Sequence, residues 1–284
     1  EKVRENASLI STAAQYQVPL ASDLASLSLT TNVNYMGRQH FHDTDVLTAS
    51  RFYANDEPAL RQMSALLQAW DLGLADVTVE MLDVPNEKGE IQRVPLPFGM
   101  HRHGDRIAKL PLFQESSGTQ SAFVLLSRLL PVLRDGGLAV IDEFEADLHP
   151  HMLMPILDLF FSDGVLVSTK GRTPGDNQVA QAEEGQIVPE GIPVMVLING
   201  ESASASEILA GGLKDRKRAF LLGEKTFGKG SVQQVLPFGR TAFKITTARY
   251  YTPADITPDK VGVTPHREFK TPVMSEEDLQ VFRK

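Results

Sequence analysis

The chain has 284 residues, 42% of them hydrophobic, which is enough for one large or two small domains with a real core and excludes wholesale disorder. Its formal net charge is −8 and its longest basic run is "KDRKR" at 214–218, which argues against broad binding to nucleic acid or anionic membranes. The absence of cysteine excludes disulfides, thiol nucleophiles and thiolate metal sites, and no apolar stretch is long enough to span a bilayer.

The first half of the chain begins with local patterns of a helix and a hairpin. The segment "DEPALRQMSALLQAW" repeats its apolar residues at helical spacing and predicts a helix over 56–70. The β-rich segments "VTVEMLDV" and "IQRVPLPF" are joined by the turn "PNEKGE" and predict a hairpin, followed by a short strand over 107–113.

A second helix is predicted from Ser116, and Pro131 should bend or end it, because proline lacks the N–H of a helix interior. The segment "GGLAVIDE" predicts a buried strand over 136–143, and an apolar run predicts a short helix over 148–161.

The second half of the chain predicts strands alternating with one helix. The helix should begin on the small residues of "SASASEILAGGLKD" and cover 202–215. The strand over 192–200 should be central in its sheet. The other strands are expected at 164–169, 218–223 and 239–253.

One motif set lies around the strand over 136–143. Four apolar residues end in Asp142 and Glu143, which resembles a Walker B strand, where the first acid holds Mg²⁺ through water and the second orients the attacking water. Upstream, "ESSGTQ" places Ser117 and Gly118 at a predicted helix N-terminus, where free N–H groups and the helix dipole bind phosphate. "ADLHP" follows the acids.

Signature motif, Walker B strand and D-loop in this order resemble the ABC-class AAA ATPases over about residues 1–157. The resemblance implies ATP and Mg²⁺ as cofactors and a dimer partner that completes the nucleotide site. It also implies a P-loop upstream of the signature, and residues 1–110 contain no G-x-x-x-x-G-K sequence.

A second motif set is "NGESASASEILAGGLKDRKRAFLLGEKTFGKGSVQQ". Ser204 lies where a strand ends and a helix begins, between the small residues Ala203 and Ala205, and the N–H of Ala205 is free to donate to an oxyanion. A nucleophilic serine needs a base, and Lys229, between glycines, can supply it. We expect Lys229 to be largely buried within hydrogen-bond reach of Ser204, because burial lowers the pKa of a lysine.

This stretch is similar to the C-terminal processing peptidases, also called tail-specific proteases, over about residues 158–268. The resemblance implies a serine endopeptidase without a cofactor that cleaves near the C-termini of unstructured polypeptides. It implies Ser204 as nucleophile, Lys229 as general base, and Asp215 and Gln233 as supporting polar residues. The PDZ domain and the upstream glycine-rich oxyanion turn of that family have no counterpart in this sequence, so we expect slow cleavage.

The segment "GEKTFGKGS", from Gly223, also matches the first part of a P-loop. A P-loop continues with serine or threonine for Mg²⁺ and then feeds a helix, whereas this segment continues with Gly230 and the strand-like "SVQQVLPFG". We therefore interpret Lys229 as a catalytic base rather than a phosphate ligand.

The sequence predicts an α/β chimera, with a partial ABC-type ATPase lobe over 1–157 fused to a partial C-terminal processing peptidase core over 158–284, a mixed sheet with flanking helices. Alternative functions are ATP hydrolysis and an inactive interaction module. Neither a nucleic-acid patch nor a signal peptide is evident from Glu1 onward, and we interpret the chain as a fragment or processed product. The compartment stays open, because the peptidases are usually exported and the ATPases cytoplasmic.

Overall fold

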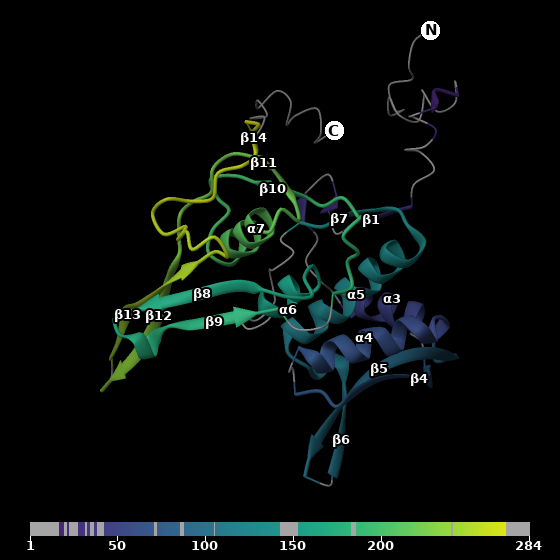
Figure 1. Cartoon of the computed structure of the whole chain (residues 1–284). Coiled ribbons are helices and arrows are strands. Elements are labelled where there is room, and N and C mark those ends of the chain that lie inside the picture. Colours follow the sequence, from purple (N-terminus) through teal and green to yellow (C-terminus); the bar gives the residue numbers. More distant parts are fainter. Residues whose placement is uncertain are drawn as a thin grey trace. The chain divides into compact units, whose positions relative to one another are not determined.

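The computed structural model describes the chain in segments, and Figure 1 labels its helices and strands. The described residues are 17–19, 22, 28–31, 33–34, 37–38, 43–70, 73–85, 88–104, 106–142, 153–182, 186–239 and 241–270. The chain divides into two compact units, Glu1–Leu148 and His149–Lys284. The predicted domain boundary at 157/158 stays a prediction.

The first unit is built on the antiparallel sheet β4-β5-β6 and on three helices. Helices α3 and α4 pack on this sheet, and α5 packs against both helices (Figure 1). The predicted helix over 56–70, the hairpin and the following strand are confirmed. The elements are α3 (Asp43–Asn55), α4 (Glu57–Ala69), α5 (Ser117–Asp135), β4 (Asp76–Pro85), β5 (Ile91–His103) and β6 (Arg106–Pro111), with the 3₁₀ turn η1 (Leu112–Gln114).

Local sequence explains where α4 and α5 begin. The side chain of Asp56 caps α4 by accepting the N–H of Ala59, and the side chain of Ser116 caps α5 by accepting the N–H of Thr119. The sequence predicts that Pro131 bends or ends the second helix, and it does not end it, because α5 continues through it to Asp135. The bend stays a prediction. A single missing N–H is tolerated here because the long apolar face of α5 is held by packing.

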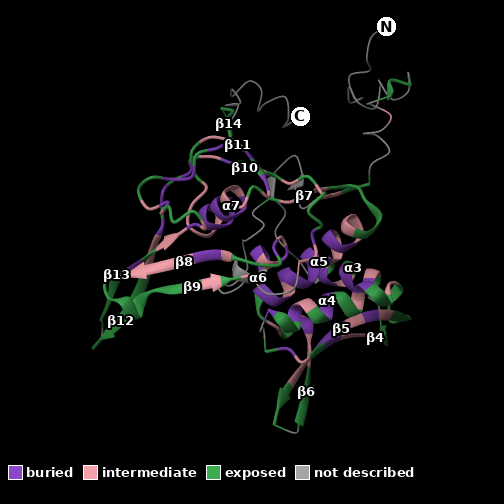
Figure 2. Ribbon diagram, in the orientation of Figure 1, coloured by how far each residue is buried: buried purple, intermediate pink, exposed green. Residues whose placement is uncertain are grey.

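The core of the first unit lies between its helices and the sheet, as the buried residues in Figure 2 show. Tyr53 and Phe123 are fully buried, with ring centroids 4.8 Å apart, and the Tyr53 hydroxyl donates to the Phe123 carbonyl at 3.0 Å. Other side chains that are completely buried are Met63, Leu67, Leu112 and Leu126.

The expected buried strand over 136–143 is shorter and more exposed than predicted. It is β7 (Leu138–Val140), which pairs in parallel with β1 (Leu29–Thr31), and both Leu138 and Val140 are exposed. An apolar strand becomes buried only when other layers cover both of its faces. In the described residues β7 belongs to a two-stranded sheet, which leaves those side chains open. A second short pair joins β2 (Val33–Asn34) to β3 (Gly37–Arg38).

The second unit contains two sheets. The antiparallel sheet has the order β12-β13-β8-β9, the parallel sheet has the order β10-β11-β14, and α7 packs against β8, β11 and α6. The elements are α6 (Leu153–Asp158), β8 (Val165–Gly171), η3 (Pro174–Asp176), β9 (Gln178–Gln181), β10 (Met195–Ile198), α7 (Ala205–Asp215), β11 (Phe220–Gly223), β12 (Ser231–Phe238), β13 (Thr241–Tyr251) and β14 (Arg267–Glu268).

The strands and the helix predicted for this unit are present, but the position of one strand differs. The strand expected to be central, β10, lies at the edge of its sheet in the described part of the chain, with Met195 and Leu197 exposed. Its apolar sequence fits a central strand, and only the pairing of neighbouring strands decides its place. Ile156, Leu157, Leu159, Leu166, Leu213 and Leu221 form the core of the unit.

Candidate active site

The strand-to-helix connection before α7 places Ser204 in an unusual backbone conformation. Ser204 is the N-cap residue of α7 and has φ 62° and ψ −112°. A residue with a side chain rarely adopts such a conformation, which costs on the order of 1–3 kcal/mol and persists only where the surroundings enforce it. Strain of this kind is common at functional sites, and Ser204 is half-buried rather than covered.

The residue that enforces this conformation is Glu207, which is 0% exposed. Its Oε2 accepts the backbone N–H of Ser204 at 2.9 Å and the backbone N–H of Lys229 at 2.7 Å. Its Oε1 accepts the Thr226 hydroxyl at 2.6 Å and the Gly228 N–H at 2.7 Å. One buried carboxylate thus ties the start of α7 to the loop that carries the lysine.

This shared carboxylate fixes the distance between the two halves of the predicted dyad. Because one oxygen accepts both N–H groups, the backbone nitrogens of Ser204 and Lys229 lie within about 6 Å of each other. The structure therefore brings together two residues that are far apart in the sequence.

The expectation that Lys229 is buried is wrong, because its side chain is exposed. Among the described residues no hydrogen bond joins the Ser204 hydroxyl to the Lys229 amine. The backbone of the loop is held by Glu207, but β12 begins two residues later as an outer strand with exposed side chains. Because most side chains of this strand are not covered by another described layer, the Lys229 amine stays exposed.

The other predicted peptidase residues lie at different places. Ala205 is the first residue of α7, so its N–H has no acceptor within the helix and can donate to an oxyanion. Gln233 lies on β12 opposite Thr246 and is exposed. Asp215 is not brought to the site, because it lies in the last turn of α7 and accepts the N–H of Ala254 at 3.1 Å.

Glu207 is the functional residue that the sequence interpretation missed. The signal was present, because Ser204 and Glu207 form the S-x-x-E pattern of a capping box, in which the glutamate returns to the N–H of the cap residue. The pattern alone, however, does not reveal that the same carboxylate also binds the lysine loop.

The glycines of "GEKTFGKGS" serve close packing of the backbone. A Cβ at Gly230 would lie 2.6 Å from the Asp259 nitrogen, and Gly228, with φ 94°, lies against the backbone of 260–262. The segment after Lys229 is the strand β12 and not a helix. This confirms the prediction that the sequence after the motif is a strand, which a P-loop does not permit.

The predicted phosphate-binding residues of the first unit are at a helix start. Ser117 and Gly118 are the first residues of α5, as predicted, and their N–H groups belong to the first turn, where helices bind anions. Asp142 follows β7 and is exposed. Glu143 lies outside the described residues.

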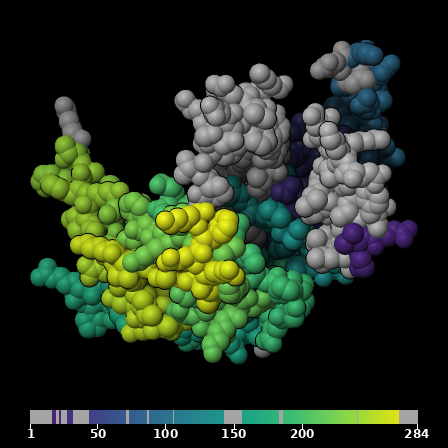
Figure 3. All heavy atoms as spheres, turned by 90° about the horizontal axis from the view of Figure 1, so that it is seen from above, coloured from purple at the N-terminus to yellow at the C-terminus, as the bar shows by residue number. Residues whose placement is uncertain are grey.

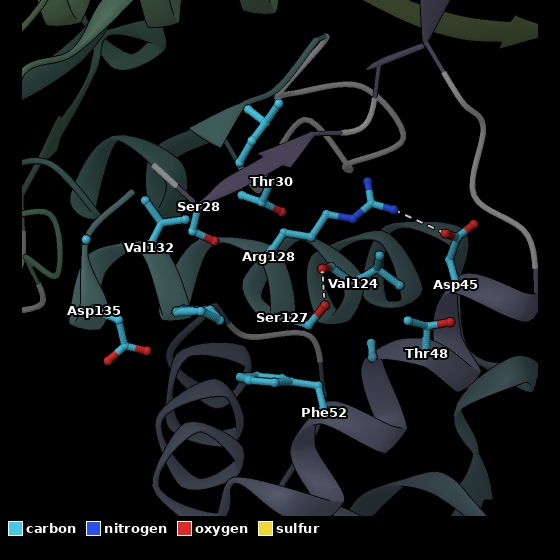
Figure 4. Close-up of a pocket in the computed structure, with 14 residues that line it drawn as sticks. Ser28, Thr30, Asp45, Thr48, Phe52, Val124, Ser127, Arg128, Val132 and Asp135 are labelled. Carbon is cyan, nitrogen blue, oxygen red and sulfur yellow. Dashed lines mark hydrogen bonds and ion pairs between the residues drawn. The ribbon is translucent and has the colours of Figure 1, made fainter. Parts of the chain in front are cut away.

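A pocket in the first unit contains none of the predicted site residues. It has a volume of about 510 Å³ and lies between α3, α5 and the start of β1, with Phe52 and Val124 among its apolar lining (Figure 4). An ion pair between Arg128 and Asp45, 3.1 Å long, lies at one end of the pocket.

The described residues contain no group of three or more histidine, cysteine, aspartate or glutamate side chains that could hold a metal ion. His101 instead contacts the Glu115 carboxylate through Nε2 at 2.7 Å and the Gly73 carbonyl through Nδ1 at 2.9 Å. None of the described helices is long and apolar enough to cross a membrane.

Two family models match the chain. The model of peptidase family S41 matches residues 151–269, and a model described as an AAA domain, putative AbiEii toxin of a type IV toxin–antitoxin system, matches residues 9–179. The matches overlap over 151–179, and β8 within this overlap pairs with β13 and β9 of the second unit.

Curated relatives of this chain include C-terminal processing peptidases. A carboxy-terminal-processing protease of Bartonella bacilliformis is 47% identical over 111 residues, which are 39% of this chain and 25% of that protein. The chloroplastic carboxyl-terminal-processing peptidase 2 of Arabidopsis thaliana is 49% identical over 94 residues, 33% of this chain and 16% of that protein. The chain thus spans a quarter or less of the length of these two relatives.

Among solved structures, a photosystem II D1 C-terminal processing protease aligns with 74% of this chain and 61% of its own, at 22% identity and a TM-score of 0.45. This likeness adds nothing to the family matches.

Proposed function

We propose that the chain is a serine endopeptidase with a Ser204/Lys229 dyad, because its residues 151–269 match the model of peptidase family S41. Over residues 9–179 the chain belongs to the AAA domain family. Its substrates are unstructured polypeptides, which it cleaves near their C-termini. The observation that carries the proposal is the Glu207 carboxylate, which holds the N–H groups of both dyad residues.

The proposed reaction is an acyl transfer in two steps. The Ser204 hydroxyl attacks a peptide carbonyl while the neutral Lys229 amine takes its proton, and the resulting lysinium then protonates the leaving amine. The N–H of Ala205 donates to the oxyanion that forms on the carbonyl oxygen. Water, activated by the same amine, releases the acyl group from Ser204.

The geometry of α7 supports these roles. The strained conformation of Ser204 is held by the buried Glu207 carboxylate, which accepts the Ser204 N–H. Lys229 is exposed before a substrate is present, and a bound polypeptide would cover it and remove water from the amine.

Cleavage of an unstructured, fluorescently quenched peptide by the full chain tests this function. We expect slow cleavage, because one missing oxyanion donor typically costs about a hundred- to a thousandfold in turnover. Ser204→Ala and Lys229→Ala should each abolish it, whereas Ser116→Ala, the same kind of change at the start of α5, and Glu143→Gln should leave it unchanged. Cleavage that survives in the Ser204→Ala protein would exclude the dyad.

Nucleotide binding is a second candidate function, favoured by the AAA family match and by the position of Ser117 and Gly118 at the start of α5. These N–H groups could hold a phosphate, and Asp142 could hold Mg²⁺ through water. They form one side of a nucleotide site, and the sequence over 1–110 contains no P-loop for the other side.

We therefore expect affinity for ATP and Mg²⁺ weaker than micromolar, which equilibrium binding of labelled ATP measures. A dimer partner that supplies a P-loop would raise this affinity. Micromolar binding that disappears in Lys229→Ala would instead return "GEKTFGKGS" to a phosphate-binding role.

A further inference from the structure

The strand that follows the proposed base has an open outer edge. In the described part of the chain, β12 is an outer strand of the sheet β12-β13-β8-β9. It begins at Ser231, two residues after Lys229, and its side chains from Gln233 to Phe238 are exposed. With β13 it forms a hairpin that extends from the second unit, in yellow-green in Figure 3.

The backbone groups that face outward along this edge can be assigned. The Gly230 carbonyl accepts the N–H of Tyr250 at 2.8 Å, so residue 230 turns its polar backbone groups toward β13. These groups alternate in direction along an antiparallel strand. The bulge between Val232 and Gln233 places its extra residue, Thr247, on β13, so the alternation along β12 continues and Ser231, Gln233 and Val235 turn their groups away from β13. The next outward residue is Pro237, and proline occurs in sheets where its missing N–H would face away from the ladder.

One face of the hairpin is apolar and open. Leu236 pairs with Phe243, and Gln234 pairs with Ile245, so these side chains share a face with Phe238. We call Leu236, Phe238, Phe243 and Ile245 the hairpin face. All of them are exposed, and the rings of Phe238 and Phe243 lie 5.4 Å apart between centroids.

We propose that the outer edge of β12 binds the polypeptide substrate as an added β-strand, with apolar side chains at alternate positions on the hairpin face. Strand addition of this kind takes its affinity from main-chain hydrogen bonds and its specificity from alternate side chains. The proposal rests on the peptidase function, and it assigns Ser231, Gln233 and Val235 as the backbone partners of the substrate.

Two observations favour a substrate over a second copy of the chain. The open donors start next to Lys229, whose N–H shares the Glu207 carboxylate with Ser204, so a strand along this edge leads to the dyad. Pro237 removes the donor at the far end of the edge, which shortens the ladder that two copies of β12 could form.

The two outer strands of the sheet provide a matched pair of variants. Directly after β9, the N–H of Ala182 donates to the Gly164 carbonyl. The bulge in this pair places its extra residue, Leu166, on β8, so the alternation along β9 continues and Val179 turns its N–H outward. Val179 and Val235 are both exposed, at 59% and 64%. Val235→Pro and Val179→Pro therefore each remove one outward N–H, from opposite edges of the same sheet.

The test measures binding of a fluorescein-labelled peptide of alternating alanine and valine to the full chain by fluorescence anisotropy. Every protein in this test also carries Ser204→Ala, which prevents cleavage of the peptide. We expect Val235→Pro to weaken binding about tenfold or more and Val179→Pro to leave it unchanged. Peptides N-methylated at one position at a time should lose affinity at every second position.

Equal effects of the two proline variants, or a uniform response to N-methylation, would overturn the proposal. If circular dichroism shows that Val235→Pro does not fold, the N-methylated peptides decide alone. A change in sedimenting mass with Val235→Pro, without a change in peptide affinity, would assign the edge to a second copy instead.

The same proteins with Ser204 intact separate the two proposals. Wild-type cleavage that Val235→Pro leaves unchanged contradicts the strand addition but not the dyad. If N-methylation weakens peptide binding at every second position but the wild-type chain cleaves no peptide, the peptidase function is contradicted and the peptide-binding edge is not.

Discussion

Two helices of this protein begin at a serine, and the two serines differ in backbone geometry. Ser116, before α5, has φ −59° and ψ 150°, and its side chain accepts the N–H of Thr119. Ser204, before α7, has φ 62° and ψ −112°, and its own N–H is bound by the Glu207 carboxylate. The first is an ordinary N-cap, and the second is a strained residue held by its surroundings.

The difference teaches how a helix cap can be told from a presented nucleophile. At α5 the serine side chain stabilises its own helix. At α7 the helix start is stabilised by Glu207, and the same carboxylate binds Thr226, Gly228 and Lys229 from a distant loop. The backbone strain at Ser204 is thus maintained by a carboxylate that also holds a distant loop.

The largest expected effect is that of Glu207→Gln, which turns one acceptor oxygen into a donor facing N–H or O–H groups. We expect peptide cleavage to fall about a thousandfold and stability to fall by about 3 kcal/mol, because buried donors lose their acceptor. Urea unfolding and the cleavage assay measure both. Ser116→Ala, at the other helix, should cost only about 1 kcal/mol and no activity. Equal losses in the two variants would remove the distinction between the helix starts.

A medium effect is expected when each of the two serines is replaced by glycine. Ser204→Gly should be more stable than Ser204→Ala by about 1 kcal/mol, because glycine adopts positive φ without strain. Ser116→Gly should cost a few tenths of a kcal/mol relative to wild type. Thermal melting of the variants checks this. If Ser204→Gly and Ser204→Ala melt together, Ser204 is not strained in solution.

The smallest expected effect concerns pH and the start of α5. The hydrogen bond that His101 donates to the carboxylate of Glu115, the residue directly before Ser116, raises the pKa of His101 above its usual value. A raised folded-state pKa contributes stability that is complete below the unfolded pKa of about 6.5 and is lost as pH rises through the folded value. The melting temperature of the wild-type chain should therefore fall as pH rises through the folded-state pKa of His101. This fall should be absent in His101→Gln and present in Lys270→Gln, a control in the second unit.

Sequence by itself determined the local elements. The helical spacing and Asp56 located α4, Ser116 located the start of α5, and the alternation after Lys229 excluded a helix and with it a P-loop. The motif around Ser204 and Lys229 also predicted a catalytic dyad, which stays a prediction. These features depend on residues close together in the chain, where periodicity and capping act without tertiary contacts.

Tertiary structure decided which side chains meet and which are covered. It gave the Asp215 carboxylate the N–H of Ala254 as its partner, left Lys229 exposed and gave Glu207 its partners from a loop some twenty residues away. It also left β7 and β10 open, although both are apolar in sequence. The physical reason is that burial and hydrogen-bond partners depend on the segments that pack against a residue, and a local pattern does not contain them.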